Sequence, residues 1–215
     1  MTATSPTPAR RARILPVRPV RAALFMLLFA ALLWAIEAVD LLVFQGALDV
    51  DGGIIPRQLD GLDGIAFSPL LHANWAHLAA NTVPFLVFGF LVLANGIGQF
   101  LAVTALIWVL GGAMVWLTGS AGVTVGASGV IFGWLAFLLV RGFFARPRAW
   151  GQIGLAVVLL LVYGGVLWGV LPGTPGVSWQ AHLFGALAGV VAARLVASAD
   201  RPRTREQVQT PPIGS

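Results

Sequence analysis

The chain has 215 residues, of which 58% are hydrophobic and only 10% are charged. A soluble domain of this size carries about 25% charged residues, so the composition excludes an ordinary soluble protein and indicates a single-domain integral membrane protein. The absence of cysteine excludes disulfides, a thiolate nucleophile and thiolate metal ligands. The net charge of +5 comes from 13 arginines with no lysine. They flank apolar runs, which favours orientation in a membrane over nucleic-acid binding.

Six apolar segments follow one another along the chain, each near the ~20 residues that a helix needs to cross ~30 Å of hydrocarbon. They cover residues 22–44, 77–95, 99–118, 126–144, 150–170 and 179–198. The first follows several arginines, as in a signal peptide, but it is longer than a signal h-region and five more segments follow, so we interpret it as a retained helix. We therefore expect an all-α membrane protein with a six-transmembrane-helix bundle over residues 22–198. Residues 1–21 and 199–215 are predicted to be disordered tails.

Arginine placement predicts the orientation of this bundle. Six spans put both termini on one side of the membrane, and that side holds every arginine except Arg57. The positive-inside rule then predicts a multi-pass protein of the cell membrane with both termini in the cytoplasm. Arg57 lies in the 45–76 connection, whose apolar patches predict that it lies in or on the outer leaflet.

Four polar residues from three predicted helices fall near one depth. Ser128 precedes Arg141 by thirteen residues and His182 precedes Arg194 by twelve, so at 1.5 Å per residue both lie about 18–20 Å above the cytoplasmic boundary. Asn81 reaches about the same level, and His77 lies one turn higher on the same helix face. Polar groups inside a membrane are costly and usually functional. A hydroxyl nucleophile and an imidazole base at one depth indicate proteolysis within the membrane.

Each of these residues also has a purely structural interpretation. A serine among glycines can serve helix packing, a histidine can be a hydrogen-bonded core residue or line a channel, and the residues at 77 and 81 can hydrogen-bond across the bundle. The pairs Gly129/Gly133 and Gly185/Gly189 allow close packing of the fourth and sixth helices, which both interpretations require. His72 is expected to hold the long connection by hydrogen bonds.

Missing residues exclude several reaction classes. No Asp or Glu occurs between Asp63 and Asp200, which excludes the aspartate pair of an intramembrane aspartyl protease and the His-Glu-x-x-His zinc motif. The absence of lysine excludes a Ser-Lys dyad. We therefore expect no metal and no cofactor, and a base that works without an orienting carboxylate. Proton-coupled transport would have only Glu37 and Asp40 as candidate carboxylates, and these could simply mark where the first helix leaves the membrane.

Three motifs together resemble the rhomboid family of intramembrane serine proteases, over roughly residues 22–198. The segment Gly126-Ala-Ser128-Gly129 resembles the family's Gly-x-Ser-Gly nucleophile motif. The histidine of Ala-His182-Leu-Phe-Gly185, with Gly189 four residues on, resembles its Ala-His-x-x-Gly-x-x-x-Gly helix, and His77-x-x-x-Asn81 resembles its His-x-x-x-Asn motif.

The resemblance implies a six-helix serine endopeptidase that cleaves transmembrane helices of membrane proteins near the outer face. Ser128 and His182 would form the dyad, and the Ser128 N–H with His77 and Asn81 would hold the oxyanion. Phe132 stands where many members have a tyrosine and would stack on the imidazole. Residues 171–177 would form a mobile cap over the site. The chain lacks the Trp-Arg pair that many members carry in the first outer loop. An inactive membrane-helix binder and a small transporter remain as alternatives.

Overall fold

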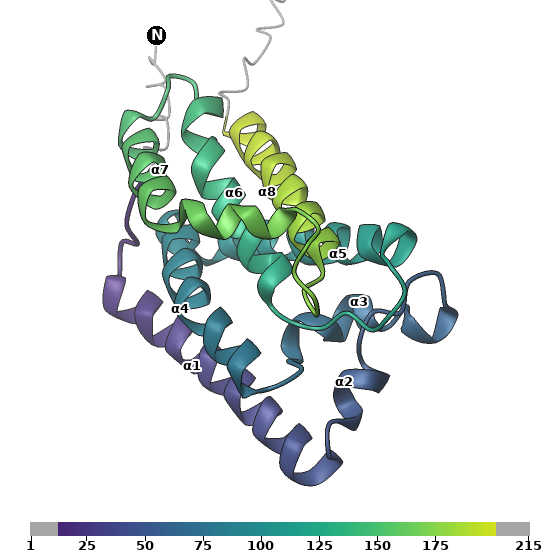
Figure 1. Cartoon of the computed structure of the whole chain (residues 1–215). Helices are drawn as coiled ribbons and strands as arrows, with labels where there is room; N and C mark the ends of the chain where they lie inside the picture. Colours follow the sequence, from purple (N-terminus) through teal and green to yellow (C-terminus); the bar gives the residue numbers. More distant parts are fainter. Residues whose placement is uncertain (1–12, 201–215) are drawn as a thin grey trace, which may run out of the picture.

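The computed structural model describes residues 13–200, so most of both predicted tails lies outside it. This part of the chain is helical, and its one strand-like pairing is a bridge between Ile54 and Thr124. Six main helices form the bundle (Figure 1). They are α1 (Pro19–Val39), α4 (Trp75–Val92), α5 (Ile97–Thr118), α6 (Ser128–Phe144), α7 (Trp150–Tyr163) and α8 (Trp179–Ala199).

Three of these helices continue in a different winding. A π-helix (Asp40–Phe44) follows α1, and 3-10 turns follow α4 (Leu93–Asn95) and α7 (Gly164–Val170). With these extensions, five segments are long and apolar enough to cross a membrane, which confirms the prediction of a helical membrane protein. α6 is also apolar but has 17 residues, a length of about 25 Å.

α6 is the central helix of the bundle. It packs against α4, α5, α7 and most extensively against α8, and residues 130–138 are buried without interruption, so that every side of this stretch faces protein. A helix that is apolar all round is expected to be surrounded by protein. The predicted segment began at 126, whereas the helix begins at Ser128 because Gly126, with φ +118°, breaks the helical path.

The bundle begins before residue 22, where the sequence placed its start. α1 begins at Pro19, since proline suits the first turn of a helix. The preceding segment is also held, because the Arg13 N–H donates to Asn95 Oδ1 at 3.3 Å. Glu37 and Asp40 do not mark an exit into water, because each is about 1% exposed inside the protein.

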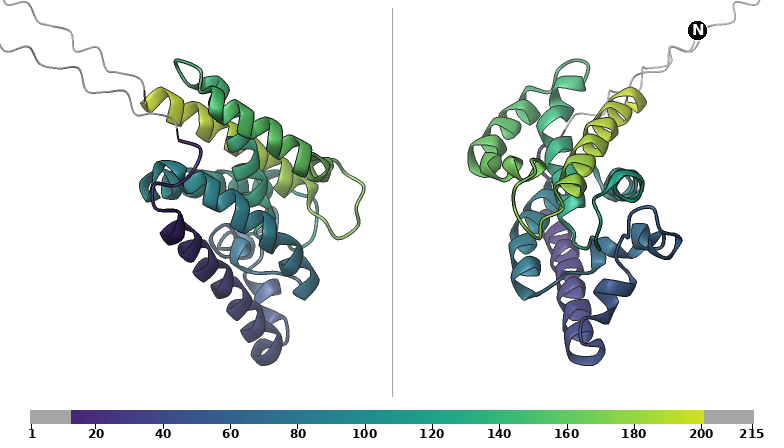
Figure 2. Two further views of the ribbon diagram at one scale, coloured as in Figure 1. Left: turned by 90° about the vertical axis from the view of Figure 1, so that its left-hand side faces the viewer. Right: turned by 45° about the vertical axis from the view of Figure 1, so that its right-hand side comes forward.

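The connection between α1 and α4 folds as a series of short helices. These are α2 (Ala47–Asp51), α3 (Gly64–Phe67) and single 3-10 turns at Leu59–Gly61 and Ser68–Leu70. Trp108 Nε1 of α5 donates to Ile65 O at 2.9 Å, and Trp116 Nε1 donates to Gln58 O at 2.8 Å, which fastens the connection to α5. Both ends of the described chain lie at the other end of the bundle from α2 and α3 (Figures 1 and 2).

Candidate active site

A cavity of about 640 Å³ lies where α6 begins. Its wall comes from the start of α4, the 120–125 segment, the first turn of α6, and residues 176–182. The four polar residues expected at one depth all line it, together with Phe132: His77, Asn81, Ser128 and His182. Residues from three helices that are far apart in the sequence therefore face one space.

The His182 ring is held on two sides. Phe132 stacks on it with ring centroids 4.1 Å apart and planes 5° apart. Its Nδ1 lies 2.9 Å from the carbonyl oxygen of Gly169. Because a carbonyl can only accept a hydrogen bond, Nδ1 carries the proton, and Nε2 of the neutral ring keeps its lone pair.

Gly169 contacts the His182 ring, and the sequence did not indicate it as part of the candidate site. A Cβ there would lie 3.0 Å from Phe132 Cζ and 3.1 Å from His182 Nδ1, so a side chain would press on the stacked pair. Its carbonyl takes the position that a carboxylate holds in a three-residue triad. The available signal was three glycines, at 164, 165 and 169, inside an otherwise apolar segment.

Ser128 is the first residue of α6. The backbone N–H groups of a first helical turn have no partner within the helix, so they are free to bind an anion. The turn before it requires glycine, because Gly126 has a positive φ and a Cβ there would lie 2.6 Å from His77 Cε1. His72 holds the same turn, since its Nε2 accepts from the Ala127 N–H at 3.3 Å.

Asn81 and His77 bring polar groups to the cavity from α4. Asn81 is 7% exposed, and among residues 13–200 its Nδ2 has no hydrogen-bond partner. An unmatched buried donor is costly, so its place on the wall of a cavity suggests a ligand. The His77 ring packs edge-on against His72, with centroids 5.2 Å apart.

Glycines bring α6 and α8 into backbone contact below the cavity. A Cβ on Gly185 would lie 2.8 Å from the carbonyl carbon of Gly129, and one on Gly189 would lie 2.8 Å from that of Gly133. In each case the carbonyl oxygen would be closer still. The two glycine pairs therefore set the separation between the helix that carries Ser128 and the helix that carries His182.

Within residues 13–200, no group of three or more His, Asp and Glu side chains is arranged to hold a metal ion. In the same part of the chain, Ser128 Oγ and His182 are not joined by a hydrogen bond, although both line the cavity. Catalytic hydrogen bonds are often long before a substrate binds.

A family model and several relatives of known sequence match most of this chain. A family model described as "Rhomboid domain" matches residues 61–199. The chain is 51% identical over 185 residues to the uncharacterized protein Rv1337 of Mycobacterium tuberculosis, covering 82% of this chain and 75% of the relative. It is 50% identical over 185 residues to the uncharacterized protein ML1171 of Mycobacterium leprae, covering 82% of this chain and 72% of that protein.

Proposed function

The chain belongs to the rhomboid family, and we propose that it is an intramembrane serine endopeptidase acting on transmembrane helices of membrane proteins. The observation that carries this proposal is the orientation of His182 on the wall that it shares with Ser128. The Gly169 carbonyl and the Phe132 ring fix the imidazole in the tautomer whose Nε2 can accept a proton.

The proposed reaction is acyl transfer. His182 Nε2 takes the proton from Ser128 Oγ as the oxygen attacks a substrate carbonyl, and then gives that proton to the leaving backbone nitrogen. Water hydrolyses the resulting ester on Ser128 with the same base. The Gly169 carbonyl, which accepts from Nδ1–H, favours the imidazolium that forms during each step.

The oxyanion would be held by donors at the start of α6 and on α4. The Ser128 N–H is available because it belongs to a first helical turn, and Asn81 Nδ2 is buried without a partner among the described residues. His77 reaches the cavity beside Gly126. Donors fixed before the charge develops lower the barrier most, and removal of one costs about 10²–10³ in rate.

The position of the cavity supports cleavage near the outer face. The cavity lies at the α6 end where α2 and α3 are found, and both described chain ends lie at the other end. With the arginine-rich side in the cytoplasm, we propose six membrane crossings and cytoplasmic termini. α6 would cross with fewer residues because protein surrounds it and irregular backbone leads into it. The substrate helix must unwind to expose a carbonyl, so Gly or Pro near the bond should assist cleavage.

Fluorophosphonate labelling of the purified full chain tests the dyad. Ser128→Ala should abolish both labelling and cleavage of a model transmembrane substrate in proteoliposomes. Ser120 is a matched control because it lines the same cavity and its hydroxyl accepts from Gln180 Nε2, so Ser120→Ala should still be labelled. Labelling that survives Ser128→Ala but not Ser120→Ala would reject the assignment.

An inactive membrane-helix binder is the second candidate. The absence of a Ser128–His182 hydrogen bond within residues 13–200 favours it. It predicts that the wild-type chain binds helices but is neither labelled nor able to cleave them, so the same experiment decides between the two functions.

A further inference from the structure

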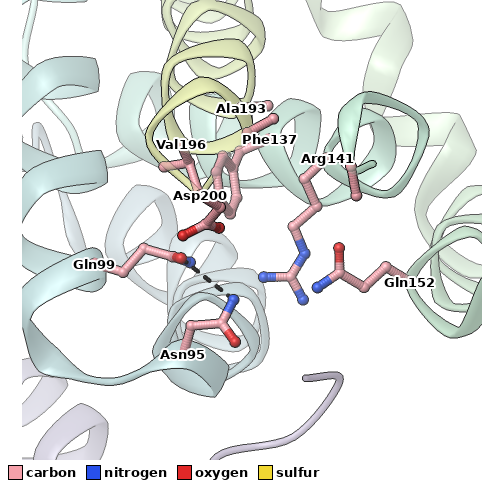
Figure 3. Close-up of a pocket in the computed structure, with 10 residues that line it drawn as sticks. Asn95, Gln99, Phe137, Arg141, Gln152, Ala193, Val196 and Asp200 are labelled. Carbon is pink, nitrogen blue, oxygen red and sulfur yellow. Dashed lines mark hydrogen bonds between the residues drawn. The ribbon is translucent and has the colours of Figure 1, made fainter. Parts of the chain in front are cut away.

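A second cavity, of about 40 Å³, lies at the opposite end of α6 from Ser128 (Figure 3). Arg141 reaches into it from the last turn of α6, thirteen residues and about 20 Å from Ser128. Gln99 and Asn95 line it from the α4–α5 corner, Gln152 lines it from α7, and Asp200 lies at its rim after α8. The proposed protease mechanism uses none of these groups.

The Arg141 side chain is buried with most of its donors unmatched. The residue is 4% exposed, and within residues 13–200 its guanidinium makes one hydrogen bond, from Nη2 to Arg13 O at 3.3 Å. Among residues 13–200, Arg141 Nε and Nη1 have no acceptor, and neither has the buried Nε2 of Gln99. Asp200 is exposed, and it forms no ion pair with Arg141 within the described chain. A buried guanidinium without a counter-ion is costly because it stays charged at neutral pH.

We propose that this cavity binds one phosphate-type oxyanion, carried by a lipid headgroup or free in solution. Nη2 carries a second N–H besides the one that it donates to Arg13 O, and with Nε or Nη1 it forms a planar fork that fits two oxygens of a phosphate. Gln99 Nε2 offers a third donor. At ~10–15 Å³ for each water-sized group, the cavity of about 40 Å³ holds roughly three to four such groups, which is close to the four oxygens of one phosphate. Water alone would satisfy the donors but would leave the charge uncompensated.

The bound anion would also fix the segment before α1. The Arg13 carbonyl accepts from Arg141 Nη2 and from Gln152 Nε2, the latter at 3.1 Å, while the Arg13 N–H donates to Asn95. This segment therefore joins the ends of α4, α6 and α7. An anion that orders the guanidinium would hold all three ends together. Basic pockets between membrane helices commonly bind phosphate headgroups at this level.

Calorimetric titration of the purified full chain with sodium phosphate, against sodium chloride of equal ionic strength, provides the first test. We expect saturable binding at one site, reduced ~10–100-fold in Arg141→Gln by loss of charge-assisted hydrogen bonds. Arg194→Gln is the matched control, because Arg194 is an exposed arginine of α8 outside the cavity wall. Asp200→Asn changes only the rim and should tighten phosphate binding roughly five-fold by removing a repulsive charge. That variant keeps the test decisive if Arg141→Gln does not fold.

Native mass spectrometry separates the two sources of phosphate. The chain is incubated with phosphatidylglycerol or with diacylglycerol of the same acyl chains. Selective retention of phosphatidylglycerol that requires Arg141 indicates a lipid headgroup, and binding of inorganic phosphate without lipid retention indicates a free anion. The proposal is overturned if neither probe binds wild type or Asp200→Asn, or if Arg194→Gln weakens binding as much as Arg141→Gln. These readouts measure binding, so they do not depend on the proposed protease activity.

Discussion

Replacing Gly185 with alanine should disable catalysis without touching a polar group of the site. The new Cβ would lie 2.8 Å from the Gly129 carbonyl carbon, whereas ordinary van der Waals contact begins at 3.4 Å. Relieving that contact requires a shift of 3.4 − 2.8 = 0.6 Å, and the closer carbonyl oxygen requires more, so α8 would move from α6 by roughly 1 Å. A 1 Å misplacement of catalytic groups costs about 10²-fold in rate. We expect kcat/KM for a model transmembrane substrate to fall by about that factor.

Two glycine variants serve as controls for this prediction. A Cβ on Gly154 of α7 would meet nothing within 4 Å, and one on Gly111 of α5 would lie 3.5 Å from Gly185 Cα, an ordinary contact. Both alanine variants should keep near wild-type cleavage and labelling in proteoliposomes. Circular dichroism and gel filtration would establish that Gly185→Ala is still folded. A folded Gly185→Ala protein with more than half of the wild-type activity would refute the idea that this contact sets the distance between Ser128 and His182.

Three further predictions concern single side chains near the cavity. Asn81→Ala should lower kcat by ~10–10³-fold with little change in KM, as for one oxyanion donor, and should still allow fluorophosphonate labelling; unchanged kcat would remove Asn81 from the oxyanion site. Phe132→Leu removes the stacking on His182 and should slow labelling of Ser128, because the imidazole is then held only by Gly169; an equal labelling rate would contradict this. Burial, then the neighbouring His77, lowers the pKa of His72 from 6.5 to about 4. The unfolded chain therefore binds the extra proton between pH 6.5 and 4, so stability should fall as pH falls through that window, by at most about 3 kcal/mol. Burial, with Asp40, raises the pKa of Asp49 from 3.8 to about 6, which has the opposite sign. The melting temperature should therefore be measured against pH for wild type and for His72→Gln, which keeps an acceptor but does not titrate. The same pH dependence of the melting temperature in both proteins would contradict the prediction.

The positions of the membrane helices were largely readable from the sequence. The predicted starts at 77, 99, 150 and 179 lie within two residues of the observed starts of α4, α5, α7 and α8, because a bilayer demands long apolar runs. The type of helix that each run forms could not be predicted. Composition does not distinguish an α-helix from the 3-10 helix at Gly164–Val170 or from the π-helix at Asp40–Phe44. The 3-10 helix matters for the site because it supplies the Gly169 carbonyl to His182.

The candidate site was predictable as a set of residues but not as a geometry. Counting helical residues from the arginines placed Ser128 and His182 at one depth, and both line one cavity. Depth says nothing of rotation about each helix axis. The stacking of Phe132 on His182 was expected only from the family resemblance, and the contact of His182 with the Gly169 carbonyl, which sets its tautomer, was not predicted. Arg141 illustrates the same limit. In the sequence it is a topological marker at the end of an apolar run, whereas in the fold it is a buried guanidinium with unmatched donors.

The backbone that leads into Ser128 depends on a connection distant in the sequence. Residues 119–127 are not helical, and irregular backbone at membrane depth is tolerated only when other parts of the protein satisfy its polar groups. Ile54 and Thr124 exchange two backbone hydrogen bonds of 2.9 Å, and the Gly126 N–H donates to Ser68 O at 2.9 Å.

Arg57 makes a further contact with residues 119–127. Its Nη1 donates to the carbonyl oxygen of Gly119, at the start of that segment, at 2.8 Å. The chain lacks a Trp-Arg pair in this connection, yet an arginine of the same connection holds the segment that ends at Ser128. Ser128 is therefore positioned from both sides. It begins α6, and contacts from the connection between α1 and α4 fix the turn that precedes it. Changes in that connection should consequently act on the orientation of Ser128 before they act on the stability of the bundle.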